Sequence, residues 1–537
     1  MRQRLSRVLS RLERLAGRRL GALVLFVVAL AVYAFEAIGW PLVGGRDLDE
    51  YLYDYVQFLD WHPLLPWSML FRTPAMPIFA GASLDVAGGF VAEPLMGVLF
   101  AGSIVAWAAA ARAFGTRASL LVAAALLVYP AYGLLFHELS SDALFGAAFA
   151  LWAWLVVRAA VQPSAGRYAL AGAAVALCAL VRPGNALLLA FVFIVLVVRG
   201  SWRERGRWAA AFLAAGALPL VAWSVLNGVR FDYYGLARGG NAVVPFYRAF
   251  ISDKIVSPDN GPASRELARA IQQHLLTRDP YKAYHVTLRR VFTSGSFRIH
   301  EDLYLLSDEY FGWKTNYSIL RKAGIEAVRK HPGTYTSGVA HTVWHQLSQS
   351  YFRSTPQPAA KRASATTAAS AKGAPPPPTE GEPIPAGQSV WISTPDNRIR
   401  DVWTSATQHH FVFRYPHDRV RFDQVERELD GLFGNLPTRR GNAELSLRMD
   451  QASRWYPRLI LWIALGVVAL IWRRPRSAAI LAALALAAFA VVFFNALGLF
   501  ADRHFVLPVA PAFVLFGAAA LLGSRRSSVE TTASTTR

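Results

Sequence analysis

The sequence has little cysteine and little charge. Among its 537 residues there is one Cys, and Asp, Glu, Lys and Arg together make up 17%, whereas soluble domains carry about 25%. The lone Cys178 has no partner for a disulfide, which excludes a small secreted fold held by disulfides. Apolar residues make up 54% of the chain, and this much apolar surface excludes disorder as the dominant state.

Acidic residues are scarcer than basic ones. The 56 Lys and Arg residues against 35 Asp and Glu residues give a formal net charge of +21. A charge of this size is typical of nucleic-acid-binding proteins, but in an apolar chain it also arises from basic residues that flank membrane spans. The positions of the basic residues along the chain decide between these two explanations.

Long apolar runs are abundant. Runs of about 18–22 residues have the length that an α-helix needs to cross a bilayer. The ten predicted spans cover residues 20–40, 88–111, 118–136, 142–158, 167–182, 184–199, 208–227, 455–472, 477–499 and 504–523. The sequence therefore predicts an all-α polytopic membrane protein.

Arginine clusters indicate the orientation of these spans. They stand before the first span, between the sixth and seventh, between the eighth and ninth, and after the last. With a cytoplasmic N-terminus every cluster lies inside, as the positive-inside rule requires. We therefore predict two cytoplasmic termini, and we interpret the positive charge as a topology signal and not as a nucleic-acid-binding surface.

The predicted topology divides the chain into domains. These are a basic cytoplasmic segment (1–19), a transmembrane core (20–227) whose first external loop is 41–87, an extracytoplasmic domain (228–454), C-terminal transmembrane helices (455–523) and a cytoplasmic tail (524–537). Apolar residues at helical spacing predict that the extracytoplasmic domain is mainly helical. Its Ala/Thr/Ser/Pro-rich stretch at 354–388 predicts a flexible linker.

Five of the scarce acidic residues stand together in the first external loop. Asp47, Asp49, Glu50, Asp54 and Asp60 fall within fourteen residues. A solvated loop outside a span is one explanation. The loop is also rich in Tyr, Trp and Leu, which favours a position at the membrane surface. There a carboxylate can meet a lipid-linked substrate, and partial burial can raise its pKa toward that of a useful base.

The segment GGRDLDEYLY at 44–53 resembles a motif in the first external loop of bacterial GT-C glycosyltransferases. These polytopic enzymes are related to protein O-mannosyltransferases and to the lipid A aminoarabinose transferase, and an Asp of this loop is their catalytic base. Alignment on Gly-Arg-Asp implies Asp47 as the base. Alignment on the Asp-Glu pair of many relatives implies Asp49 and Glu50. Both alignments stay open, with Asp47 ranked first.

Three further segments are similar to motifs of the same family. They are FRTPAMPIFAG at 71–81, ALVRPGNALLLA at 179–190 and ADRHFVLPVAPAFVL at 501–515. The resemblance implies that Arg72, Arg182 and Arg503 bind the donor phosphate, and the planar guanidinium group suits phosphate oxygens. Anchoring at the membrane edge is the alternative for the first two.

The segment HELSSDALFGAAFAL at 137–151 resembles the family's acidic segment that enters a span from outside. Asp142 matches the acidic position, and His137 and Glu138 stand just before it. We expect these three residues to line the site or to contact the acceptor, with a helix N-cap as the alternative for Asp142. Two adjacent residues without a third ligand are a weak metal signal. We predict no metal site and no cofactor, and a need for a divalent metal stays open.

The resemblance implies a membrane glycosyltransferase that moves a sugar, with inversion, from a polyprenyl-phosphate donor to an acceptor outside the membrane. A glycosyl phosphate is already a good leaving group, so one carboxylate suffices to take the acceptor proton. We expect a bacterial plasma (inner) membrane enzyme with its site on the external face. Its expected partners are the lipid-linked sugar, a cell-envelope acceptor (glycan, lipid or protein) and membrane lipids.

Three other classes of function stay open, and one of them is a non-enzymatic membrane scaffold with an external interaction domain. A transporter or flippase is disfavoured because no inverted halves are evident and the charged residues lie at the external surface, not at mid-membrane. A polymerase or ligase of surface polysaccharide would rely on external Arg and His residues, for which His62, His409 and His410 are candidates.

Overall fold

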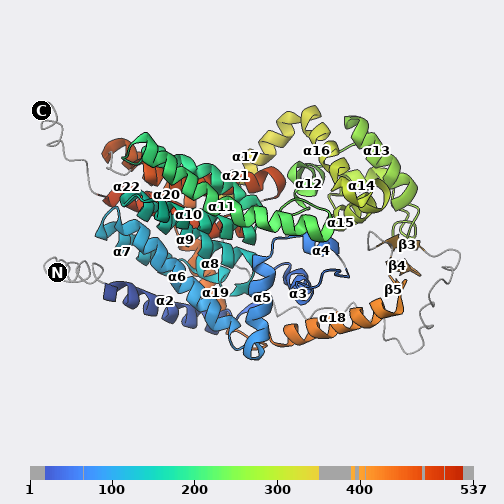
Figure 1. The fold of residues 1–537 in the computed structure, drawn as a ribbon, viewed down its shortest axis with the longest axis horizontal. Coiled ribbons are helices and arrows are strands. Elements are labelled where there is room, and N and C mark those ends of the chain that lie inside the picture. The colour runs from blue at the N-terminus through green and yellow to red at the C-terminus, as the bar shows by residue number, and fades with distance from the viewer. Residues whose placement is uncertain are drawn as a thin grey trace, which may run out of the picture.

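The computed structural model describes residues 19–64, 66–349, 389–392, 398–405, 407–473, 478–500 and 502–523. The chain forms a bundle of long helices and a head domain of shorter elements, which we define as residues 232–349 and 389–434. The head domain lies at the end of the bundle away from the start of α2 and the end of α22 (Figure 1).

Among the described residues, ten apolar helical segments build the bundle. They are α2 (Arg19–Gly39), α6 (Ala92–Arg112), α7 (Thr116–Leu127), α9 (Ser141–Val161), α10 (Ala165–Val181), the 3₁₀ segment η2 (Pro183–Val197), α11 (Trp202–Phe231), α20 (Leu459–Arg473), α21 (Ala478–Gly498) and α22 (Ala510–Leu522). In the described part of the chain, 6 helices are long and apolar enough to cross a membrane, and shorter apolar helices accompany them. Each predicted span overlaps one of these segments, and the prediction of an all-α polytopic membrane protein is confirmed.

Two predicted spans differ in detail from the observed segments. The run at 118–136 is broken, because α7 ends at Leu127 and Pro130 begins the short helix α8 (Pro130–Leu135). Proline lacks an amide hydrogen and therefore begins a helix more readily than it continues one. The run at 184–199 forms a 3₁₀ helix after Pro183, where an α-helix was expected.

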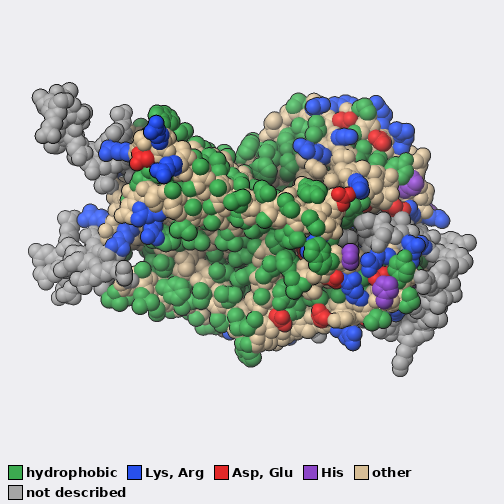
Figure 2. Space-filling model, in the orientation of Figure 1, with side chains coloured by type: hydrophobic (Ala, Val, Ile, Leu, Met, Phe, Trp, Pro, Cys, Tyr) green, Lys and Arg blue, Asp and Glu red, His purple; other side chains and the backbone are tan. Residues whose placement is uncertain are grey.

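Small residues allow the bundle helices to approach closely. A Cβ atom added at Gly172 of α10 would lie 2.0 Å from the backbone oxygen of Phe212 in α11, so glycine is required at this contact. The outer surface of the bundle is an apolar belt, and Lys and Arg gather at the end away from the head domain (Figure 2). Side chains such as Ile471, 66% exposed, belong to this surface. A belt of this kind matches the hydrocarbon core of a membrane.

The first loop and its surroundings form the junction between bundle and head domain. Its elements are β1 (Val43–Gly44), α3 (Leu48–Val56), α4 (Pro66–Phe71), α5 (Ala75–Asp85) and β2 (Glu138–Leu139). The helix α18 (Pro416–Gly434) packs against α3 and α5, and α19 (Ala443–Trp455) packs against α2 and α8.

The head domain is mainly helical. Its elements are α12 (Gly240–Ala242), the π-helical segment η3 (Val243–Ser252), α13 (Pro262–Ala270), α14 (Leu288–Ser294), α15 (Phe297–Leu306), α16 (Ser318–Lys330), α17 (Pro332–Ser348) and α18 (Pro416–Gly434). The strands β3 (Ser389–Ile392), β4 (Ile399–Trp403) and β5 (His409–Phe413) add an antiparallel sheet in the order β3-β4-β5, which the sequence did not predict. The predicted linker at 354–388 lies outside the described residues.

Arg238 fastens the head domain to the first loop. Its side chain is fully buried between the rings of Trp313 and Tyr317, 3.6 and 4.3 Å from their centroids, and pairs with Asp308. Its backbone amide donates a hydrogen bond to the carbonyl of Leu70 in α4 (2.6 Å). A desolvated, fully partnered arginine is costly to disturb. The segment that leads into Arg72 is therefore held by the head domain.

Candidate active site

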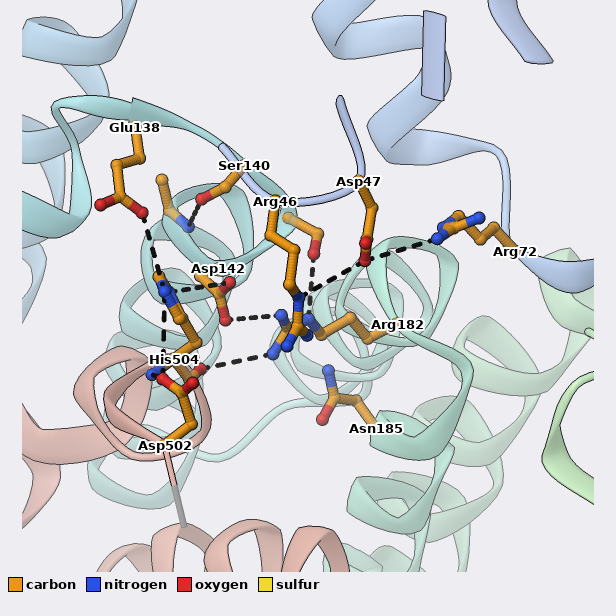
Figure 3. A network of polar contacts seen from close by, with 12 residues as sticks. Arg46, Asp47, Arg72, Glu138, Ser140, Asp142, Arg182, Asn185, Asp502 and His504 are labelled. Atoms are coloured by element: carbon orange, nitrogen blue, oxygen red, sulfur yellow. Dashed lines mark hydrogen bonds and ion pairs between the residues drawn. The ribbon is translucent and has the colours of Figure 1, made fainter. Parts of the chain in front are cut away.

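A short parallel bridge joins the first loop to the start of α9. The amide of Val43 donates to the carbonyl of His137 (3.0 Å), and the amide of Gly45 donates to that of Leu139 (3.2 Å). A Cβ atom added at Gly45 would lie 2.5 Å from the Cβ of Ser140, so only glycine fits this approach. The bridge places the acidic first loop beside the second acidic segment (Figure 3).

Asp47 stands between two arginines. It precedes α3 in the left-handed conformation (φ 63°), and its side chain makes no capping hydrogen bond. Its Oδ2 atom lies 3.5 Å from Nε of Arg46 and 3.4 Å from Nη2 of Arg72 (Figure 3). The Asp47 side chain is 33% exposed. The carboxylate is thus held by charge and remains open to an incoming molecule.

Arg72 is the more deeply placed of these two arginines. It follows α4, its side chain is 14% exposed, and it forms ion pairs with Asp47 and Glu50. Its guanidinium carbon lies 5.0 Å from the centroid of the Tyr51 ring. Burial lowers the pKa of Arg72, and the charge of Asp47 opposes this effect. A guanidinium group stays charged at neutral pH, so Arg72 is a desolvated cation beside two carboxylates.

Asp142 and Arg182 form a second ion pair within the same network. Oδ1 of Asp142 lies 2.5 Å from Nη2 of Arg182, and the Asp142 side chain is 3% exposed. Nε of Arg182 donates to Oγ of Ser141 (3.1 Å), and the Tyr51 hydroxyl donates to the same oxygen (3.1 Å). The hydroxyl of Ser140 caps α9, so the carboxylate of Asp142 is left to the ion pair.

His504 joins the network from the segment before α22. Its Nδ1 atom lies 3.3 Å from Oδ2 of Asp142, and its Nε2 atom lies 3.8 Å from Glu138 and 3.9 Å from Asp502 (Figure 3). The side chain of the predicted phosphate ligand Arg503 lies outside the described residues. Sequence reasoning named Arg503 and missed both His504 and Arg46, although each stands next to a predicted site residue in a motif.

His137 and Glu138 face opposite ways. Glu138 lies in the network beside His504. The His137 ring is buried, lies 3.6 Å from Glu36 and stacks on Tyr33 with ring centroids 4.3 Å apart. Burial lowers the pKa of His137 to about 3, so the imidazole is neutral. The structure places His137 in the core beside the site.

The remaining acids of the first loop have different surroundings. Asp49 is exposed on α3, Asp54 is buried, and Asp60 pairs with Arg421 of α18. Glu50 contacts Arg72, as described above. Asp47 and Glu50 of this cluster thus form ion pairs with the phosphate-ligand candidate Arg72, and the charge of Asp49 also acts on it. Within the described part of the chain, no group of three or more His, Cys, Asp or Glu side chains has an arrangement that would hold a metal ion.

Asp54 is expected to make the stability of this region depend on pH. Burial raises the pKa of Asp54 to about 7, and the hydrogen bond that Ser68 donates to it (2.7 Å) opposes the rise. The pKa of Asp54 is higher in the folded chain than the roughly 3.9 of an unfolded one. The contribution of the protonated Asp54 carboxyl to the free energy of unfolding is therefore complete below about pH 4, and it is lost as the pH rises through about 7.

Asp54→Asn, which is neutral at every pH, should therefore flatten the fall in thermal unfolding midpoint between pH 5.5 and 8.5 in detergent. Asp49→Asn, at an exposed position of the same helix, should keep the wild-type slope. A wild-type midpoint that does not fall over this range would contradict the prediction.

Comparison with known sequence families gives a match to part of the chain. Residues 78–225 match the sequence family described as dolichyl-phosphate-mannose-protein mannosyltransferase. The matched range contains Glu138, Asp142 and Arg182 and begins after Arg72. It covers little more than a quarter of the chain and supports the resemblance to GT-C glycosyltransferases that the loop motifs carry.

Solved structures give more distant likenesses. One is the oligosaccharyltransferase AglB from Archaeoglobus fulgidus in complex with an inhibitory peptide and a dolichol-phosphate (12% identity, TM-score 0.41, 93% of this chain and 50% of that chain). Another is ArnT from Cupriavidus metallidurans bound to undecaprenyl phosphate (13%, 0.34, 94% and 78%). The chain thus spans half the length of the archaeal protein. A search of curated protein sequences found no match.

Proposed function

We propose that this chain transfers a sugar from a polyprenyl-phosphate donor to an extracytoplasmic acceptor, with inversion. The observation that carries the proposal is the position of Asp47 between Arg46 and Arg72, beside the Asp142–Arg182 pair. This arrangement offers carboxylates that are about a third exposed, Asp47 among them, and several cations beside them. A dolichyl-phosphate sugar in the name of the matching family supports a lipid-phosphate donor.

Arg72 is the proposed principal ligand of the donor phosphate. Its present partners are the carboxylates of Asp47 and Glu50, which are a third or more exposed. A phosphate can replace such partners and accept two parallel hydrogen bonds from one guanidinium group. Arg182 already forms an ion pair with Asp142 and donates a hydrogen bond to Ser141, so we assign it a structural role in the site. We also assign it a contact with the outer side of the donor phosphate. Arg503 remains a proposed third ligand.

Asp47 is the proposed general base. In the transfer, the acceptor hydroxyl oxygen attacks the anomeric carbon from the face opposite the phosphate, and the bond between that carbon and the phosphate oxygen breaks. The electron pair of this bond leaves with the phosphate, beside Arg72. Asp47 takes the proton of the acceptor hydroxyl, which is the proton transfer that general-base catalysis requires. Attack from the opposite face inverts the anomeric configuration.

The proposed location is the bacterial plasma (inner) membrane, with the head domain outside and both termini in the cytoplasm. Lys and Arg gather at the end of the bundle away from the head domain (Figure 2), and this distribution supports the orientation. An extracytoplasmic site needs a lipid-linked sugar, because nucleotide sugars do not reach that side. A cell-envelope molecule is the proposed acceptor.

Purified protein in nanodiscs with a polyprenyl-phosphate sugar tests the donor class. Arg72→Ala should lower transfer about 10²- to 10³-fold, as expected when a charge-stabilising donor is removed, and Arg72→Lys should recover part of the activity. Arg439→Ala is a suitable control, because this half-exposed arginine pairs with Glu93 and not with the network.

Product formation from radiolabelled donor would be measured by chromatography. A wild-type protein that releases no sugar from any polyprenyl phosphate would contradict the proposed function. If transfer by the Arg72→Ala variant depended on donor concentration as the wild type does, Arg72 would not be a ligand of the donor phosphate.

A further inference from the structure

Helix α15 of the head domain makes ring contacts near both of its ends. At one side, the Tyr304 ring packs on Phe71, the residue before Arg72, with centroids 5.4 Å apart. At the other side, the Phe297 ring meets the edge of Tyr247 at 5.8 Å. The helix begins at a capping residue, Ser296, whose hydroxyl accepts from the amide of Ile299, so its first turn is well defined.

A chain of aromatic rings continues from Tyr247 to the first loop. Tyr247 stacks on Phe500 (6.3 Å between centroids), Phe500 meets Phe505 (6.2 Å), and Arg46 lies 5.5 Å from the Phe505 ring centroid. The α15 contacts therefore reach Arg72 at one end and Arg46 at the other. These are the two arginines that hold Asp47.

Glu301 lies between these two anchor points. It stands four residues after Phe297 and three before Tyr304, so the three side chains share one face of the helix. Glu301 is exposed, and within the described residues no hydrogen bond or ion pair engages its carboxylate. Burial of part of the side chain raises the pKa of Glu301, Arg298 opposes the rise, and the nearby charges of Asp302 and Asp47 add to it.

The neighbouring charged groups on α15 are already engaged. Asp302 accepts a hydrogen bond from the Tyr281 hydroxyl (2.6 Å) and another from Nε of Arg298 (3.2 Å). Arg298 is therefore directed to Asp302. Glu301 is left as an exposed carboxylate on the same face of α15 as Phe297 and Tyr304, and its charge interacts with that of Asp47.

The charged side chains around Asp47 limit which net charge an acceptor can carry if it binds there. Arg46, 44% exposed, and Arg72 would repel a cationic group, while Asp47 and Glu301 would repel an anionic one. A neutral molecule with many hydroxyl groups suits both. Carboxylates accept hydrogen bonds from hydroxyls, and an exposed aromatic ring such as Phe297 (53% exposed) packs against the apolar face of a sugar ring.

We propose that Glu301 and Phe297 form an acceptor subsite for a neutral carbohydrate, in which Glu301 accepts hydrogen bonds from acceptor hydroxyls and orients the reacting hydroxyl toward Asp47. This inference rests on the proposed glycosyl transfer. It narrows the acceptor from glycan, lipid or protein to glycan.

The test uses full-length protein in nanodiscs, a radiolabelled polyprenyl-phosphate sugar and three acceptor probes: neutral disaccharides, a serine-rich peptide and phosphatidylglycerol. Wild-type protein should transfer the sugar to a disaccharide. Glu301→Gln and Glu301→Ala should raise the KM for that acceptor about 10- to 100-fold, the range expected when a hydrogen bond to a charged group is lost. The KM for the donor should stay unchanged.

Glu266→Gln, on the exposed face of α13, is the matched control and should leave every parameter unchanged. Unfolding midpoints check that the Glu301 variants fold. Transfer only to the peptide or the phospholipid, or hydrolysis of the donor without transfer to any disaccharide, would overturn the carbohydrate subsite. An unchanged acceptor KM in Glu301→Ala would overturn the role of Glu301. A wild-type protein that neither transfers nor hydrolyses the donor would instead defeat the proposed function itself.

Discussion

Asp47→Asn is expected to abolish sugar transfer while the protein still inserts and folds. The substitution keeps the size of the side chain and removes the group that takes the acceptor proton, and general-base catalysis contributes about 10²- to 10⁴-fold. Asparagine tolerates the left-handed conformation that Asp47 adopts (φ 63°), so the loop backbone should be unchanged. The lost ion pair to Arg46 is partly exposed and contributes little to stability, and the more buried Arg72 keeps Glu50 as a partner.

Asp49→Asn is the natural control, since Asp49 lies two residues away and is exposed on α3. Both variants would be assayed in nanodiscs with a polyprenyl-phosphate sugar, together with their unfolding midpoints. An active Asp47→Asn with an inactive Asp49→Asn would move the base by two residues, to the second alignment of the loop motif. Full activity in both variants would show that the general base does not lie in this loop.

Much of the fold could be predicted from hydropathy, because a bilayer demands long apolar helices and leaves few alternatives. The break between α7 and α8 follows from Pro130 and could have been anticipated. The sheet of β3, β4 and β5 could not, because its short strands carry mixed polar and aromatic residues with no clear alternation. Its pairing also depends on contacts between segments rather than on local pattern.

The candidate site was predictable in part. The motifs named Asp47, Arg72, Asp142 and Arg182, and the structure brings them into one network. The contact of His504 with Asp142 joins segments far apart in the chain, so no local pattern could indicate it.

The sequence also did not indicate that Glu138 lies in the network while His137 lies in the core. Successive residues of an extended segment point to opposite faces, so only one of the two can line the network. Which one does so is set by the register of β2 against β1. The sequence likewise did not indicate that α15 contacts the first loop, because this contact joins Phe71 and Tyr304, which are far apart in the chain.

Arg182→Met is expected to destabilise the protein by about 3–5 kcal/mol, the usual cost of removing one partner from a buried ion pair. Asp142 is 3% exposed and would keep His504 within ion-pair distance and the more weakly acting charge of Arg46. The double variant Asp142→Asn/Arg182→Met should recover most of this loss, because neither buried charge then remains without its partner. Thermal and denaturant unfolding in detergent would measure both effects.

Arg448→Met provides the scale for an ion pair at the surface. Arg448 pairs with Glu444, both side chains are more than 70% exposed, and the expected cost is about 0–1 kcal/mol.

The activity of the double variant Asp142→Asn/Arg182→Met then separates the two roles of Arg182. If Arg182 only holds the site in shape, the restored double variant should regain transfer. If Arg182 also binds the donor phosphate, the double variant should be stable and still require much higher donor concentrations. A double variant as unstable as Arg182→Met would show that the ion pair is not what the residue contributes.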